Sequence, residues 1–151
     1  HEETVAMKLT QLSLFLENKP AHLKVPCRAL ADAGISIMTL SLADTEQFGI
    51  LRLIVRAWQK AKEVLENAGC VVNTTEVVAV EVEDRPGGLA DLLDIIEKAG
   101  INIEYMYAFT FGRGDRAILV FRFEDPDEAV TKLQAAGVGV VEGISLYSRG
   151  T

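Results

Sequence analysis

Hydrophobic and polar residues follow two periods along this chain, and together they predict a series of short strands and helices. Residues 77–82 are mostly β-branched and apolar, as in a strand, and they end at the turn-forming run 84–88. From Leu89 to Ile96 apolar residues recur at spacings of three and four, which predicts a helix that Gly100 ends. Beyond it the pattern predicts a strand at 101–111, a hairpin turn at 112–115, a strand at 117–123, a helix beginning at 125–128 and a strand at 138–147.

The first half of the chain predicts the same order of elements. They are strands at 11–17, 35–44, 48–55 and 71–76, and helices at 23–33 and 59–67. The residues themselves recur 66 positions later (83 − 17 = 66): Glu17, Pro20, Leu23, Gly34 and Ile37 become Glu83, Pro86, Leu89, Gly100 and Ile103. The repeat predicts two domains, 7–75 and 76–148. Each has the order of a ferredoxin-like βαββαβ unit, an α+β fold whose antiparallel sheet carries both helices on one face.

Composition limits the partners of such a chain. It has 151 residues, 49% of them hydrophobic, and a net charge of −7 with a pI near 4.8. Nucleic acids and anionic membranes bind clustered Lys and Arg, so neither is expected as a partner. No apolar run approaches the length of a membrane span, and no export signal is recognised, so a cytoplasmic location is expected. Units this small with exposed sheet edges also favour a homodimer.

Few residues suit catalysis or metal binding. Cys27 and Cys70 lie outside any CxxC pair, which favours free thiols over a disulfide, and no metal or other cofactor is expected. The two histidines, His1 and His22, belong to no Ser/His/Asp pattern. The sequence therefore favours a non-catalytic protein.

The candidate site is the loop that follows the first strand of each repeat. In the second copy Pro86 is followed by Gly87 and Gly88, which leave the backbone open where a helix begins. Amides at a helix N-terminus attract a carboxylate or phosphate, although the same residues also make an ordinary tight turn. In the first copy Ala21 and His22 replace the two glycines, so the two loops are not expected to be equivalent sites.

The run Glu83-Asp84-Arg85-Pro86-Gly87-Gly88-Leu89, with Ala99-Gly100-Ile101-Asn102-Ile103 after the helix, closely resembles the signature of ACT domains. These small ferredoxin-like modules bind amino acids and regulate metabolic enzymes. The resemblance covers both halves, so the chain resembles a tandem ACT protein that binds a free amino acid and regulates an enzyme or its own assembly. It also implies that two modules pair side by side into an eight-stranded sheet.

In this family the effector lies where the loop of one module faces the start of the second strand of its neighbour. The resemblance therefore implies a ligand site between modules. Its implied residues are Asn18, Pro20, Ala21, His22, Leu23, Ser36 and Ile37 from the first copy, and Asp84, Arg85, Pro86, Gly87, Gly88, Leu89, Asn102 and Ile103 from the second. Loop amides would hold the α-carboxylate, and Asn18 or Asp84 would accept from the α-ammonium.

Two alternatives remain open at this point. An acylphosphatase-like enzyme has the same topology, and Arg85 and Asn102 are the conceivable counterparts of its phosphate-binding residues. A purely structural regulatory subunit, resembling the small subunit of acetolactate synthase, would have lost ligand binding. Amino-acid binding separates the second alternative from the sensor, and phosphatase turnover identifies the first.

Overall fold

The computed structural model describes residues 7–44, 46–109, 114–143 and 146. Two compact units divide the chain. The first unit is Thr10–Thr75, and the second unit consists of residues 7–9 together with the described residues from Glu76 onward. Each contains a sheet and a pair of helices in the order that the sequence predicts.

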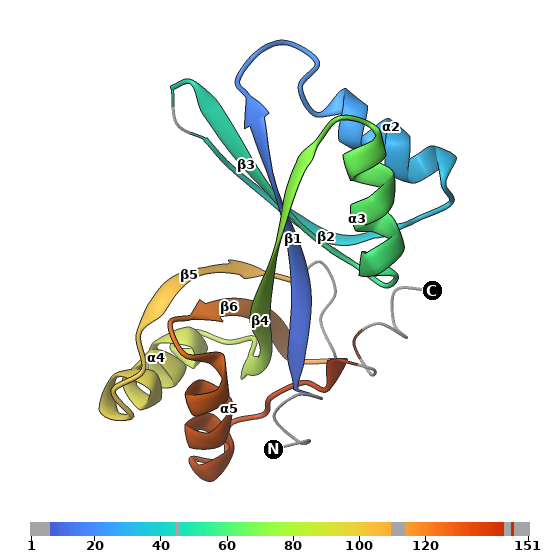
Figure 1. The fold of residues 1–151 in the computed structure, drawn as a ribbon. Helices are drawn as coiled ribbons and strands as arrows, with labels where there is room; N and C mark the ends of the chain where they lie inside the picture. Colours follow the sequence, from blue (N-terminus) through green and yellow to red (C-terminus); the bar gives the residue numbers. More distant parts are fainter. Residues whose placement is uncertain (1–6, 45, 110–113, 144–145, 147–151) are drawn as a thin grey trace. The chain divides into compact units, whose positions relative to one another are not determined.

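In the first unit, the strands are β1 (Lys8–Glu17), β2 (Ile37–Asp44), β3 (Phe48–Val55) and the beginning of β4 (Val71–Glu83), and the helices are α2 (Lys24–Asp32) and α3 (Trp58–Asn67). Strand β3 lies antiparallel between β1 and β2, and Leu53 is opposite both Leu12 and Leu40. Figure 1 shows α2 and α3 side by side. Alternate strand residues such as Leu12 and Leu14 form a core with Leu30 and Leu65 of the helices.

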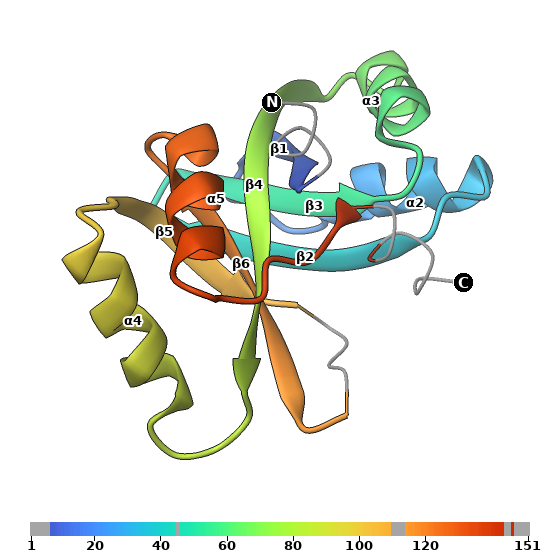
Figure 2. The ribbon, with the colours of Figure 1, turned by 90° about the horizontal axis from the view of Figure 1, so that it is seen from below.

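The second unit repeats this arrangement with the end of β4, α4 (Gly88–Lys98), β5 (Ile103–Ala108), β6 (Arg116–Phe123) and α5 (Pro126–Ala135). Strand β6 lies antiparallel between β4 and β5, with Phe121 opposite Val78 and Met106. Figure 2 shows α4 and α5 as neighbours beside these strands. The predicted helix start at 125–128 is confirmed: the Asp125 side chain accepts a hydrogen bond of 3.1 Å from the Glu128 amide, and Pro126 follows the cap.

The two units share strand β4, and this changes the number of strands. The α+β fold of duplicated ferredoxin-like units is confirmed, but the expected eight-stranded sheet is wrong. Among the described residues, six strands follow the order β2-β3-β1-β4-β6-β5. No glycine or proline interrupts 71–83, so one strand of 13 residues stands where the repeats predict two.

The other missing strand is the last one predicted, at 138–147. Within it Val140 forms an isolated bridge with Val80, and the Leu146 amide then donates to the Glu142 carbonyl at 3.1 Å, an i to i−4 bond of helical type. Residues 144, 145 and 147 of that prediction lie outside the described residues, as do 110–113 of the predicted strand and hairpin turn.

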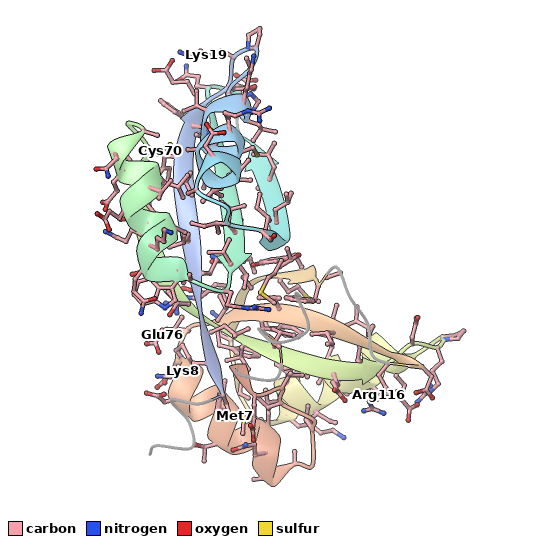
Figure 3. All side chains as sticks on the ribbon, turned by 90° about the vertical axis from the view of Figure 1, so that its right-hand side faces the viewer. Met7, Lys8, Lys19, Cys70, Glu76 and Arg116 are labelled. Atoms are coloured by element: carbon pink, nitrogen blue, oxygen red, sulfur yellow. The ribbon has the colours of Figure 1, made fainter. Side chains whose placement is uncertain are left out.

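The first described residues of the chain belong to the second unit. Met7 is 8% exposed and joins its core with Val78 and Val80. The Lys8 ammonium lies 2.7 Å from a Glu76 carboxylate oxygen and 2.8 Å from one of Asp127, and Figure 3 labels Lys8 beside Glu76. Strand β1 therefore begins in the second unit and ends in the first.

Candidate functional site

The first loop (residues 18–23) and the second loop (residues 84–89) follow β1 and β4. Both contain a left-handed residue at the same place in the repeat: φ is +68° at Ala21 and +86° at Gly87. Among the described residues Ala21 is the only one besides glycine with positive φ. Because this conformation crowds a Cβ atom, an alanine that adopts it is held there by the surrounding loop.

The loops differ at the next residue, where Gly88 corresponds to His22. A Cβ atom on Gly88 would lie 2.1 Å from the Glu83 carbonyl oxygen, so any other residue here requires the backbone to move. Helix α4 begins at Gly88, whereas α2 begins at Lys24, two residues after the corresponding position (88 − 66 = 22). Pro26 is therefore the third residue of α2, where its missing N–H costs no intrahelical hydrogen bond.

In the second loop, some backbone amides are bonded internally and others remain available. The Asp84 amide donates to Asp115 at 2.9 Å, and that of Gly88 donates to Arg85 at 3.0 Å. Within the described part of the chain, the amides of Gly87 and Leu89 have no hydrogen-bond partner. Two N–H groups at the N-terminus of α4, the positive end of its dipole, thus lack an acceptor among the described residues.

Arg85 lies across this loop and is tied to it. Its guanidinium donates to a Glu83 carboxylate oxygen through Nε, to the Pro86 carbonyl at 3.0 Å and to an Asp91 carboxylate oxygen at 3.0 Å. The hydrogen bond from Arg85 and its charge lower the pKa of the exposed Glu83 carboxyl. Since two carboxylates already accompany this guanidinium, the second loop offers no uncompensated positive charge.

Side chains of the first loop turn back on neighbouring backbone. The backbone N–H of Asn18 donates to the Gln47 carbonyl at 2.9 Å, and the side-chain Nδ2 of Asn18 lies 3.4 Å from the Glu46 carbonyl. The His22 Nδ1 lies 2.7 Å from the Lys19 carbonyl, which assigns the proton to Nδ1 as the donor. Among the described residues, the amides of Ala21 and Leu23 lack a partner, as at the second loop.

A pocket of about 210 Å³ adjoins the first loop and lies within the first unit. It is named the first-loop pocket here, and its lining is Phe15, Leu16, Glu17, Lys19, Ala21, His22, Val25, Pro26, Ala68, Gly69 and Cys70. Sequence reasoning identified Ala21 and His22 but missed the wall formed by residues 68–70. The topology supplies the missing signal, because the end of β1 and the beginning of β4 meet at the same edge of a ferredoxin-like unit.

The second-strand residues lie far from the loops of their own units. Ile37 and Asp44 are the two ends of β2, and Asp44 is opposite Gly49, next to the end of β1. Seven residues of strand separate them (44 − 37 = 7), which is about 23 Å. Ile103 and Glu83 are related in the same way in the second unit, through β6. Neither unit brings its own loop and strand start together.

Asn102 and Ser36, the polar residues of these strand starts, have different surroundings. Ser36 is exposed. The Asn102 side chain donates to a Glu124 carboxylate oxygen at 3.2 Å, and with Glu124, Asp125 and Glu128 it lines a pocket of about 270 Å³. The three carboxylates of this pocket would repel a carboxylate or phosphate group. Ile37 and Ile103 instead pack against the cores of their units.

Cys27 and Cys70 are free and half-buried, as expected of unpaired thiols. Burial raises the pKa of the Cys70 thiol, which is therefore protonated at neutral pH. In the described ranges, no group of three or more His, Cys, Asp or Glu residues is arranged to hold a metal ion. The helices in the same ranges are all too short or too polar to cross a membrane.

Comparisons with known proteins agree with this architecture. A family model described as an ACT domain pair matches residues 7–144. The crystal structure of protein BT0572 from Bacteroides thetaiotaomicron has 36% sequence identity and a TM-score of 0.87, with coverage of 94% of this chain and 97% of that chain. The chain belongs to the family of ACT domain pairs.

More distant structures have the same fold. The ligand-free regulatory subunit of aspartate kinase from Thermus thermophilus is 19% identical, with a TM-score of 0.61 over 85% of this chain and 90% of that chain. The corresponding subunit from Thermus flavus is 18% identical, with a TM-score of 0.60 over 85% and 92%. No curated protein matches significantly. These likenesses show that the fold is shared.

Proposed function

We propose that this ACT domain pair is a non-catalytic regulatory protein that binds a free amino acid. Binding would change either its affinity for a metabolic enzyme or its own state of assembly. The observation that carries the proposal is the pair of loops at helix N-termini, each with a left-handed residue and amides without a partner among the described residues. Two N–H groups beside the positive end of a helix suit an α-carboxylate.

The remaining groups of an amino acid also find suitable partners. Asp84, or the carbonyl oxygen of the Asn18 side chain, is the acceptor for the α-ammonium. Since the loop and strand start of one unit are about 23 Å apart, a ligand on a loop reaches a strand start only when another module supplies it. Such a site would favour a homodimer, in which a second copy brings further modules.

The acylphosphatase-like alternative loses support from the geometry of the second unit. Arg85 follows the end of β4, whereas Asn102 precedes β5 at the opposite end of the strands of this unit. Arg85 is also bonded to Glu83 and Asp91. A phosphate-binding arginine and a positioning asparagine must reach the same group. The structural-subunit alternative stays open and differs from the proposal in one property, ligand binding.

A thermal-shift screen of the twenty amino acids tests the proposal. A ligand present at 100 times its dissociation constant stabilises the folded protein by about 2.7 kcal/mol, which raises the melting temperature by several degrees. Acetyl phosphate serves as the control for phosphatase turnover. A shift with amino acids and no turnover supports the sensor. No shift with any amino acid leaves a structural subunit, and turnover identifies an enzyme.

A further inference from the structure

The first-loop pocket has room for a small ligand. Its volume of about 210 Å³ exceeds that of an engineered apolar cavity of about 150 Å³ that binds benzene. It is therefore large enough for a group of several carbon atoms. Both of its walls come from the first unit, one from the first loop and the start of α2, the other from residues 68–70.

Apolar side chains form much of the interior surface. Phe15 and Val25 are 49% and 54% exposed, and Leu16 and Pro26 continue the same lining. Half-exposed apolar groups around a hollow are stabilised when an apolar guest removes them from water, at about 25 cal/mol per Å². The thiol of Cys70 is neutral at pH 7, so it adds no charge to this interior.

The polar residues at the rim carry one charge of each sign. The Lys19 ammonium lies 3.4 Å from a Glu17 carboxylate oxygen, and both side chains are mostly exposed, at 66% and 69%. An exposed pair of this kind contributes little to stability, so either member can exchange its partner at low cost. Figure 3 labels Lys19 and Cys70, which mark the loop and the opposite wall of the pocket.

We infer that the first-loop pocket binds a zwitterionic amino acid with an apolar side chain of leucine or methionine size. The side chain enters between Val25 and the residues at 68–70. At this pocket Lys19 joins the loop amides in binding the α-carboxylate, and Glu17, in place of Asn18, binds the α-ammonium. This inference rests on the proposed function and places its selectivity in the first unit. An anionic side chain would approach the Glu17 carboxylate and be repelled by it.

Cys70 provides a local reporter for this site. In the Cys27→Ser background it is the only thiol, and its modification by a maleimide follows access to the pocket. The dissociation constant for leucine is first measured by calorimetry. At ten times that concentration about one pocket in eleven is unoccupied, so the modification rate should fall about tenfold. Glutamate at the same concentration should leave the rate nearly unchanged.

A matched pair of substitutions locates the binding. Ala68 and Ala136 are both exposed C-caps, of α3 and α5, with φ of −84° and −86°. Ala68→Phe places a ring at the pocket, whereas Ala136→Phe places one at the end of α5, the second helix of the second unit. Ala68→Phe should weaken leucine binding at least tenfold, and Ala136→Phe should leave it unchanged.

The outcomes separate this inference from the proposed function. Leucine binding with protection of Cys70, lost in Ala68→Phe alone, supports both. Leucine binding without protection, or with equal loss in Ala136→Phe, overturns the pocket while the sensor function stands. Tighter binding of glutamate or lysine than of leucine overturns the ligand class. Absence of binding by every amino acid removes the proposed function and this inference with it.

Discussion

Ala21 and Gly87 hold the same left-handed backbone conformation, with φ of +68° and +86°, at positions 66 residues apart in the repeat (87 − 21 = 66). The shape of this turn therefore survives the replacement of glycine by alanine. A left-handed conformation costs a residue with a Cβ atom about 1–2 kcal/mol relative to glycine. The first loop carries that cost, and the second loop does not.

Ala21→Gly should raise the free energy of unfolding. The strain relieved is about 1–2 kcal/mol, and the greater freedom of glycine in the unfolded chain offsets about 0.5–1 kcal/mol of it. Denaturant unfolding measures the difference. The control is Ala31→Gly, an exposed position inside α2, where glycine should cost about 1 kcal/mol. Equal destabilisation by both changes would show that Ala21 is unstrained.

Gly88→Ala should destabilise the second unit. The new Cβ atom would overlap the Glu83 carbonyl oxygen at 2.1 Å, so backbone must move, and overpacking of this kind costs about 1–3 kcal/mol. His22→Ala, at the corresponding place in the first loop, is the control: it creates no overlap and loses one exposed hydrogen bond to the Lys19 carbonyl, so it should cost no more than about 0.5–1 kcal/mol. Thermal unfolding of both variants measures the contrast. Two equally stable variants would mean that the helix starts do not differ for this reason.

Local chemistry made much of the fold predictable. The cap formed by Asp125 and Pro126 fixes the start of α5, and the repeated glycines that follow each helix fix their ends. The number of strands was not predictable in the same way. The lack of a strong turn residue in 71–83 indicates that strand follows strand there, but the hydrophobic pattern of one continuous strand is also that of two strands in series.

The candidate site was predictable only in its local part. The loops were predictable because proline fixes φ and glycine permits positive φ, and Pro86 and Gly87 are visible in the sequence. The wall at residues 68–70 and the acidic surroundings of Asn102 depend on which segments the fold brings together. Such contacts join residues distant in sequence, and local pattern carries no information about them until the topology is applied.

Lys8→Met should destabilise the second unit. The Lys8 side chain is only 11% exposed and lies between Glu76 and Asp127. Hydrogen bonds to charged groups contribute about 1.5–3 kcal/mol each, less here because both carboxylates are half-exposed, so a loss of about 1–2 kcal/mol is expected. Lys19→Met is the control, since its partner and its own ammonium are in water. Equal stability of the two variants would contradict a structural role for Lys8.

The contribution of Lys8 should also depend on pH in the alkaline range. Hydrogen bonds to Asp127 and then to Glu76 raise the pKa of Lys8 above its usual value of 10.5. A raised pKa in the folded state means that the stabilisation is complete below 10.5 and is lost as pH rises through the folded-state pKa. The difference in stability between wild type and Lys8→Met should therefore be constant from neutral pH to mildly alkaline pH and should shrink at higher pH. A stability difference that grows at alkaline pH would mean that folding lowers the pKa of Lys8, and would contradict this account.

Arg85→Gln should raise the pKa of Glu83. The guanidinium of Arg85 lowers that pKa by its hydrogen bond and its charge, and glutamine removes the charge. Titration of the Glu83 side-chain carboxyl carbon by NMR measures the change. Lys62→Gln, which breaks an ion pair within α3, is the control and should leave Glu83 unaffected. An unchanged titration in Arg85→Gln would mean that the two side chains are not paired in solution.

Calorimetric titration of the wild-type protein with leucine tests the central claim most directly. A sensor built on these loops should bind with a dissociation constant between about 1 μM and 1 mM, which corresponds to about −8 to −4 kcal/mol. Saturable binding heat in that range, absent when D-leucine is titrated, is the predicted result. A folded protein that produces no saturable heat with leucine or with any other L-amino acid would contradict the account.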